Sequence, residues 1–342
     1  GSIVLEGKLD ASGLASAFGG NVRVETTGNL ATLSVGDIDT SGGDGADNSN
    51  NLGGNAGTIT LTTDASGTIT LVDSTITAAG GEGAGNNAGS FGQGASITFS
   101  NKVALTTGSA VISTGVTGGS ITFENTVNGA QALELTAGTG NITFGGHVGN
   151  DDALISVAAT AAKININGGT TVVGQSVTAQ SVVTTGSQTY TGSTVLGANT
   201  TLKAIDASTL QTITFAGTVD SDNDAATPDA NSNLRTLDIT GNAEFDWAVG
   251  SNYALGGLTV SGTTQLGGDV TTQADSANGI SGNQYYTQAV TLVSDVEIET
   301  GNGSVTFGAA LDSDLDAANS NASFARNLTI AAGTGDITFE NK

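Results

Sequence analysis

Two acidic segments have residue types and a spacing that could bind a metal ion. Both follow the pattern Asp-x-Asp-x-Asp, in Asp220, Asp222 and Asp224 and again in Asp312, Asp314 and Asp316. Alternating carboxylates in a loop can place several oxygen atoms on one hard cation, as Ca²⁺ requires. The pattern therefore makes Ca²⁺ the candidate cofactor at both segments, and the alternative is a solvated acidic loop between repeats.

Neither segment is an EF-hand loop. An EF-hand needs Gly at position 6 of the loop and Glu at position 12. Position 6 is Ala225 or Ala317, and position 12 is Asn231 or Ser323. A calcium site here would have a different geometry.

A second candidate is a sugar-binding surface made of aromatic residues. Trp247 and Tyr253 flank one repeated motif, and Tyr285-Tyr286 begin another. Aromatic side chains offer a large apolar face together with a polar atom, which suits stacking on a sugar ring. We take Trp247 and Tyr253 as candidate glycan ligands. The alternative is that these side chains pack at corners of the fold.

Catalytic chemistry has few candidates. A glycosidase needs two carboxylates across a cleft, and a polysaccharide lyase needs a basic residue beside a metal or neutralising group. The chain has 8 Lys and Arg residues, and Arg235 and Arg326 occupy equivalent places in a long repeat. A residue repeated in this way favours a structural role, and His147, the only histidine, has no Cys or second His to share a metal with. We expect no enzyme, with a β-helix lyase or glycosidase as the remaining alternative.

A short tripeptide, Ile/Val-Thr-Phe/Leu, defines the elements that would position these residues. It starts at positions 59, 69, 97, 121, 142, 213, 305 and 337. Each copy alternates apolar, polar and apolar residues, which is the period of a strand with one face buried. The helix-like segment 151–163 follows the same motif as its neighbours and is therefore expected to be strand and turn.

The spacing of these strands predicts a parallel β-helix, an all-β solenoid. Steps of about 22 residues suit one coil of two or three short strands, which gives roughly fifteen rungs. The composition agrees, with 52 Gly for tight corners and one Pro, a residue that would remove a ladder hydrogen bond in stacked strands.

Longer repeats divide the solenoid into two parts. Residues 3–110 contain two Gly/Asn-rich inserts, 41–56 and 79–95, related by a constant offset of 38 positions. Residues 111–342 continue the solenoid with a super-repeat of about 92–96 residues, in 188–283 and in the partial copy 284–342. We expect one continuous rod.

Charge and composition exclude several classes of partner. The chain has 32 Asp and Glu against 8 Lys and Arg, a net charge of −24, which argues against nucleic acid and anionic membrane surfaces. It contains no apolar stretch of about 18 residues, so no membrane insertion is expected. It also contains no Met, which indicates a segment of a longer protein that continues at both ends.

Three repeated features resemble one known family. They are the Gly/Asn-rich insert before an ITL or ITF strand, the FxxxVGxxxAL motif beginning at Phe245, and the unit that begins at QTYTG. Together they cover nearly the whole chain. They resemble the repeat region of filamentous-haemagglutinin-type giant surface proteins, which Gram-negative bacteria export by two-partner secretion.

The resemblance implies a right-handed parallel β-helix, secretion to the bacterial cell surface and a structural or adhesive role. The expected function is a rigid shaft for adhesion or cell–cell contact. Its partner would be a glycan or protein on a host or neighbouring cell. A calcium- or glycan-binding β-helix module is the alternative.

Overall fold

The computed structural model describes residues 1–5, 7–28, 31–46, 52–87, 89–167, 180–222, 234–313 and 325–340. These residues form an all-β protein built from long parallel sheets, as the alternating pattern predicts, with one short 3₁₀ helix, η1 (Gly85–Asn87). Contacts divide the chain into two compact units, residues 1–165 and 166–342. Strand β15 (Ser156–Ile166) confirms the expectation of strand within 151–163.

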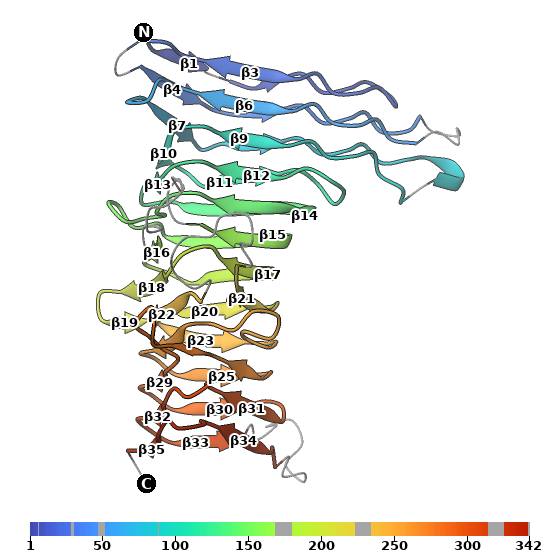
Figure 1. Ribbon diagram of the computed structural model, residues 1–342. Helices are drawn as coiled ribbons and strands as arrows, with labels where there is room; N and C mark the ends of the chain where they lie inside the picture. Colours follow the sequence, from blue (N-terminus) through green and yellow to red (C-terminus); the bar gives the residue numbers. More distant parts are fainter. Residues whose placement is uncertain are drawn as a thin grey trace. The chain divides into compact units, whose positions relative to one another are not determined.

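Unit 1 consists of three columns of parallel strands, and each column is added to once per pass of the chain (Figure 1). The first column is β1 (Ile3–Leu5), β4 (Thr32–Val35), β7 (Thr68–Val72), β10 (Lys102–Thr107) and β13 (Val127–Asn128). The second is β2 (Leu9–Asp10), β5 (Ile38–Asp39), β8 (Thr75–Thr77), β11 (Ala110–Ser113) and the first half of β14 (Ala132–Phe144). The third is β3 (Val22–Glu25), β6 (Ile59–Thr62), β9 (Ile97–Phe99), β12 (Ile121–Phe123) and the second half of β14.

The repeated tripeptide sets the register of the third column. Ile97, Ile121 and Ile142 pair in line, with 0% of each side chain exposed. The phenylalanines two residues later also stack, with ring centroids 4.7 Å and then 5.7 Å apart. Because side chains alternate across a strand, the intervening Thr residues point away from this core. The predicted buried faces are confirmed for seven of the eight tripeptides, and the exception is β35 in unit 2.

The length of chain per pass varies more than the sequence suggests. In unit 1 the side chain of Asp37 accepts a hydrogen bond from the amide of Thr75, 38 positions on, whereas Ser120 accepts one from Asn141, 21 positions on. The longer passes contain the Gly/Asn-rich inserts. The spacing of about 22 residues therefore describes only the passes without inserts.

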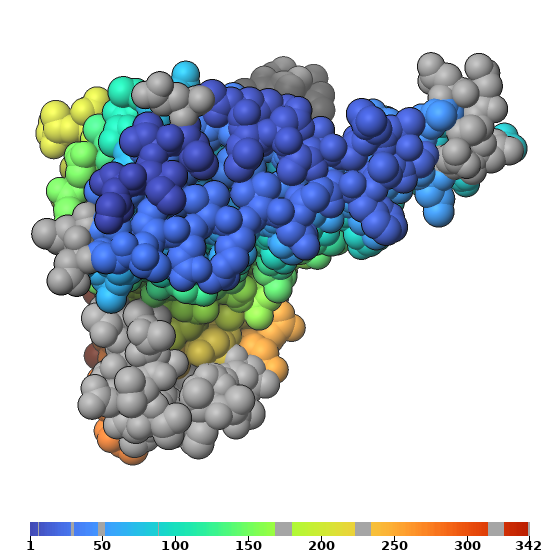
Figure 2. Space-filling view, turned by 90° about the horizontal axis from the view of Figure 1, so that it is seen from above, coloured from blue at the N-terminus to red at the C-terminus, as the bar shows by residue number. Residues whose placement is uncertain are grey.

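The inserts form arms that run outward between the second and third columns and return. Residues 11–21, between β2 and β3, form a further arm, so that three arms lie one on another, and Figure 2 shows the first of them projecting sideways from unit 1. One backbone hydrogen-bond chain crosses all three. Gly92 donates to Gly81, Gly81 to Gly54, Gly54 to Gly43 and Gly43 to Ala17, at 2.8–2.9 Å.

Glycine is required where these arms cross. A Cβ atom on Gly54 would lie 1.9 Å from the carbonyl oxygen of Ala17, and one on Gly43 would lie 2.0 Å from that of Leu14. Contacts this short cannot be relieved by rotating a side chain, since both partners are backbone atoms. The glycine content of the inserts therefore reflects close packing between main chains, as it does in other glycine-rich assemblies of extended chains.

Unit 2 repeats the three-column arrangement (Figure 1). Its first column is β16 (Gln180–Thr184), β18 (Thr200–Asp206), β22 (Thr236–Thr240), β24 (Gly257–Val260), β29 (Gln284–Tyr286), β32 (Val305–Phe307) and β35 (Ile337–Phe339). The second is β17 (Gln188–Leu196), β20 (Thr212–Phe215), β23 (Asn242–Phe245), β25 (Thr264–Leu266), β30 (Val290–Leu292) and β33 (Leu311–Ser313). The third is the end of β17, β21 (Val219–Ser221), Val249, β26 (Val270–Thr271), β31 (Val296–Glu299) and β34 (Leu328–Ala331).

Two antiparallel hairpins interrupt these columns. They join β18 to β19 (Thr209–Leu210) and β27 (Ala274–Asp275) to β28 (Ile280–Ser281). The interior of unit 2 again contains stacked rings. Along the second column, the ring centroids of Tyr190, Phe215 and Phe245 are each 5.2 Å from the next. Along the first column, the ring centroid of Phe307 lies 5.4 Å from that of Tyr286 and 5.1 Å from that of Phe339.

A buried Gln-x-Tyr motif marks the start of each super-repeat. The hydroxyl of Tyr190 donates to Oε1 of Gln188 at 2.8 Å, and that of Tyr286 donates to Oε1 of Gln284 at 2.9 Å. Each glutamine Nε2 donates in turn to two main-chain carbonyls and one threonine hydroxyl. Burial raises the pKa of both tyrosines, because the interior disfavours a phenolate.

The two copies of the super-repeat occupy different columns. Tyr190 and Phe215 lie in the second column, whereas their counterparts Tyr286 and Phe307 lie in the first. One super-repeat is therefore not a whole number of passes through the three columns. Residues that are equivalent in sequence face different directions within unit 2.

Candidate functional site

The first acidic segment supports the backbone of the next pass. Asp220 is buried at the end of β21, with 4% exposure. Its Oδ1 accepts hydrogen bonds from the amides of Asn252 at 2.8 Å and Tyr253 at 3.2 Å, and its Oδ2 accepts one from Asn252 Nδ2 at 3.0 Å. This carboxylate is thus used to fix the turn that follows Val249.

Asp222 has an equally defined partner. Its Oδ1 accepts a hydrogen bond from Nε of Arg235 at 2.9 Å, and its Oδ2 accepts one from a terminal guanidinium nitrogen at 3.4 Å. Arg235 is 6% exposed, and its amide donates to the Ser221 hydroxyl at 2.9 Å. The repeated arginine therefore neutralises a predicted metal ligand, which agrees with the structural role expected from its repetition.

The second acidic segment lies elsewhere in unit 2. Asp312 is exposed in β33 of the second column and pairs with Thr291, whereas its counterpart Asp220 lies in the third column. Asp224, Asp314 and Asp316 lie outside the described residues. Within the described ranges no group of three or more His, Cys, Asp or Glu residues could hold a metal ion. Calcium binding stays a prediction.

The two aromatic candidates lie on either side of Val249, Trp247 before it and Tyr253 after it. Trp247 is 62% exposed and Tyr253 is 44% exposed, both between β23 and β24. The carboxylate of Asp220 accepts a hydrogen bond from the Tyr253 amide, which anchors the turn that carries Tyr253. The sequence expectation of an accessible aromatic pair is consistent with this exposure, and glycan binding there stays a prediction.

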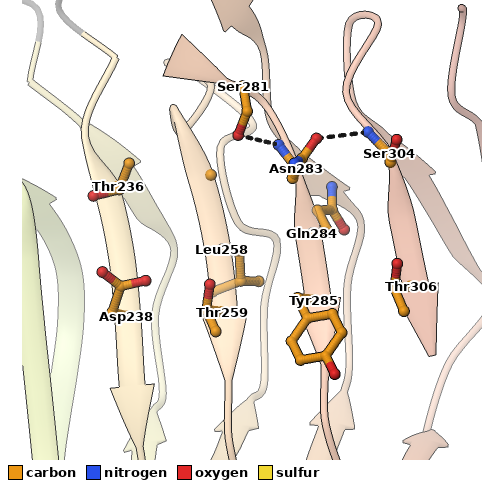
Figure 3. Close-up of a pocket in the computed structure, with 11 residues that line it drawn as sticks. Thr236, Asp238, Leu258, Thr259, Ser281, Asn283, Gln284, Tyr285, Ser304 and Thr306 are labelled. Carbon is orange, nitrogen blue, oxygen red and sulfur yellow. Dashed lines mark hydrogen bonds between the residues drawn. The ribbon is translucent and has the colours of Figure 1, made fainter. Parts of the chain in front are cut away.

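A surface groove of about 420 Å³ crosses the outer face of the first column of unit 2. It extends over β22, β24, β29 and β32, and Figure 3 shows its lining. The strand pairing places Asp238, Thr259, Tyr285 and Thr306 in one row across these four strands. A second row lies two residues nearer the start of each strand and contains Thr236, Gly257, Asn283 and Ser304.

Gly257 leaves a gap in the second row. It pairs with Thr236, and a Cβ atom at this position would lie 3.3 Å from the carbonyl oxygen of Asn283 and 3.8 Å from Cγ2 of Thr236. The floor is held by hydrogen bonds, since Ser281 Oγ accepts from the amide of Asn283 and Asn283 Oδ1 accepts from the amide of Ser304 (Figure 3). Strand pairing and these two side-chain acceptors together hold the lining residues in place.

The outer row carries the groups that can contact a ligand. Tyr285 is 37% exposed, and Figure 3 shows its ring beside Thr259, with Asp238 on the next strand beyond. The structure gives the side chains of Asp238, Thr259, Tyr285 and Thr306 no hydrogen bond or ion pair with other described residues. The lining contains one carboxylate and no Lys, Arg or His.

Two other grooves on the described surface lack this combination. One of about 240 Å³ lies over the second column of unit 2 and is lined by Glu244 with Thr, Asn and Gln residues. One of about 280 Å³ in unit 1 is lined by small and aliphatic residues around Gly7 and Gly36. Neither contains an aromatic side chain.

Sequence reasoning did not identify Asp238 or the groove. Alternation within the pair Tyr285-Tyr286 indicates that one ring faces inward and the other outward, and the structure buries Tyr286. The sequence pattern does not reveal the register of β22, β24 and β29. That register places Asp238 and Tyr285, which are 47 positions apart in the sequence, on either side of Thr259.

Comparison of the chain with protein-family models, curated proteins and solved structures finds no match. Across the described residues, no helix is long and apolar enough to cross a membrane.

Proposed function

We propose that this chain is a structural and adhesive segment of a giant secreted bacterial surface protein. In this proposal the strand columns close into a right-handed parallel β-helix of roughly fifteen rungs, which forms a rigid shaft. The protein is displayed on the surface of a Gram-negative cell, as the resemblance to filamentous-haemagglutinin-type proteins implies. The shaft holds adhesive surfaces away from the cell.

The observation that carries this proposal is the in-register stacking of like residues. Ile97, Ile121 and Ile142 form one ladder in unit 1, and Tyr190, Phe215 and Phe245 form another in unit 2. In such an array each strand contacts chiefly the strands above and below, so stability accumulates pass by pass. Bending the array would separate stacked side chains and ladder hydrogen bonds together, which supports a mechanical role.

The charge distribution suits a protein exposed to solvent on a crowded cell surface. A net charge of −24 with 12% charged residues makes neighbouring copies repel one another. Thr and other small polar residues cover the outward positions of the tripeptide strands. This surface keeps long shafts apart while the apolar ladders remain inside.

Small-angle scattering of the purified chain tests the shaft. We expect an elongated particle of constant cross-section, with roughly 70 Å of stacked rungs. A hinged or near-spherical particle contradicts the proposal. Antibodies raised against the chain test display, since they should label intact cells of the source bacterium, and labelling only after lysis contradicts a surface location.

A further inference from the structure

We propose that the groove across β22, β24, β29 and β32 binds a neutral glycan, with Tyr285 as the stacking platform and Asp238 as the principal hydrogen-bond acceptor. The inference deepens the proposed adhesive function, on which it rests, because it names the chemical class of the partner. It also assigns the site to other residues than Trp247 and Tyr253, which lie on either side of Val249.

The shape of the groove suits a short saccharide. Adjacent strands lie about 4.8 Å apart, so Asp238 and Tyr285, two strands apart, are separated by roughly 10 Å along the column. Thr259 lies between them. One sugar ring lying over Thr259 would reach both side chains, and the row continues to Thr306 for a second ring.

The chemistry of the lining matches that of a sugar. A pyranose has an apolar face of C–H groups and a rim of hydroxyls that both donate and accept hydrogen bonds. The exposed ring of Tyr285 can cover the face, while Asp238, Thr259 and Thr306 present oxygens to the rim. These oxygens are not used within the fold, so binding does not break an internal hydrogen bond.

Charge selects among glycans. The groove contains the carboxylate of Asp238 and no cationic side chain, and the whole chain carries −24. Sialylated, sulfated or uronic acid-rich glycans would place a second negative charge beside Asp238, and no cationic side chain lines the groove to neutralise it. Neutral hexoses and N-acetylhexosamines bear no such cost, and the carboxylate strengthens their hydrogen bonds.

The groove is also rigid before binding. The side-chain Oδ1 of Asn283 accepts a hydrogen bond from the amide of Ser304 at 2.8 Å, and all four strands belong to one continuous parallel column. A site held in this way loses little conformational entropy on binding. A single groove of this size would still bind weakly, and an adhesin gains strength by presenting many copies.

Glycan-array binding followed by saturation-transfer NMR and calorimetry tests the site on the intact chain. The probes are neutral gluco-, galacto-, manno- and N-acetylhexosamine-containing tetrasaccharides, with sialylated and sulfated tetrasaccharides alongside them. We expect binding to neutral members only. Tyr285→Ala and Asp238→Asn should each weaken it by about tenfold or more, and Tyr285→Phe should keep it within about threefold.

Phe91→Ala is the matched control, because Phe91 is an aromatic residue of unit 1 that is 38% exposed, close to the 37% of Tyr285, and lies outside both candidate glycan surfaces. It should leave affinity unchanged, and thermal melting of every variant should match the parent. Binding that is lost in Tyr253→Ala and kept in Tyr285→Ala overturns the assignment. Binding confined to anionic glycans overturns it too, as does the absence of binding to any probe. If no glycan on the array binds and the scattering profile is elongated, the glycan site is wrong and the shaft proposal still holds. If a glycan binds and the particle is compact, the shaft proposal is wrong and the glycan site still holds.

Discussion

Replacing Gln188 with Leu tests whether the buried Gln-x-Tyr motif holds neighbouring passes of unit 2 together. The Nε2 group of Gln188 donates to the carbonyl of Val182 at 3.1 Å, the carbonyl of Lys203 at 3.0 Å and the hydroxyl of Thr184 at 3.3 Å. Its Oε1 accepts the hydroxyl of Tyr190 at 2.8 Å. The side chain is 0% exposed, so water cannot replace these partners.

The expected cost follows from the groups left without a partner. An unsatisfied buried polar group costs about 1–3 kcal/mol, and Leu matches Gln closely enough in size to avoid a large cavity. Loss of the amide deprives two carbonyls and one tyrosine hydroxyl of a partner, which predicts a destabilisation of about 3–5 kcal/mol for Gln188→Leu.

A double-mutant cycle isolates the hydroxyl. Tyr190→Phe alone leaves Oε1 of Gln188 without its donor and should cost about 1–2 kcal/mol. In the Gln188→Leu background the same change removes an unpaired hydroxyl and should cost nothing or restore stability. The two changes should therefore couple by about 1 kcal/mol or more.

Urea unfolding followed by far-ultraviolet circular dichroism measures these free energies, and hydrogen exchange of the Lys203 strand reports the local effect. Gln284 and Tyr286 provide a second, independent copy with the same hydrogen bonds. The exposed Gln273 provides the control, since Gln273→Leu should change stability by less than about 0.5 kcal/mol. A cost of the same small size for Gln188→Leu, or additive effects of the pair, would refute the reasoning.

Three further outcomes follow from the fold. Phe215→Asp should abolish cooperative unfolding of unit 2 in circular-dichroism melts, because it buries an unpaired charge between two stacked rings, and a parental melt would contradict the register. Gly54→Ala should increase hydrogen exchange across the arms, because its Cβ would lie 1.9 Å from a carbonyl oxygen. Gly20→Ala is the control and should leave exchange unchanged, because the nearest atom to its Cβ would be 3.5 Å away. Equal effects of the two substitutions would contradict the proposed packing. Burial raises the pKa of Tyr190 and Tyr286 above that of tyrosine in the unfolded chain, so their contribution to stability is complete below about pH 10 and falls as the pH rises further. Their phenolate absorbance should appear together with loss of the circular-dichroism signal, and appearance before unfolding would show that they are accessible.

The alternating tripeptides made the buried faces predictable. Ile142 and Phe144 are buried because a strand has a period of two, and that period is visible in a single copy. Ile337 and Phe339 follow the same pattern and are 46% and 47% exposed, because no described strand covers β35 on its far side. Burial in this fold depends on the next pass as well as on the residue pattern.

The contacts between passes were not predictable in the same way. Asp222 was identified as a metal ligand from its local spacing, but its partner Arg235 lies across a segment whose length the pattern does not constrain. Tyr285 and Asp238 lie in one row, on either side of Thr259, only because of the register of three strands. The Gln-x-Tyr copies could have been found, since Gln188 and Gln284 each precede a buried tyrosine at the start of a super-repeat. In both copies the glutamine stands two residues before the tyrosine, and this repeated pair can be recognised in the sequence although the alternation of apolar and polar residues does not reveal it.

Because the second copy of the super-repeat is displaced by one column, duplication of a segment changes the direction in which its surface residues face. When a segment such as 188–283 is duplicated, its copy presents the same outward residues in a new direction. Three successive copies with the same displacement would place one surface feature on each of the three columns in turn. Duplication alone would then present that feature in three directions, and no joint would be needed to turn it towards a target.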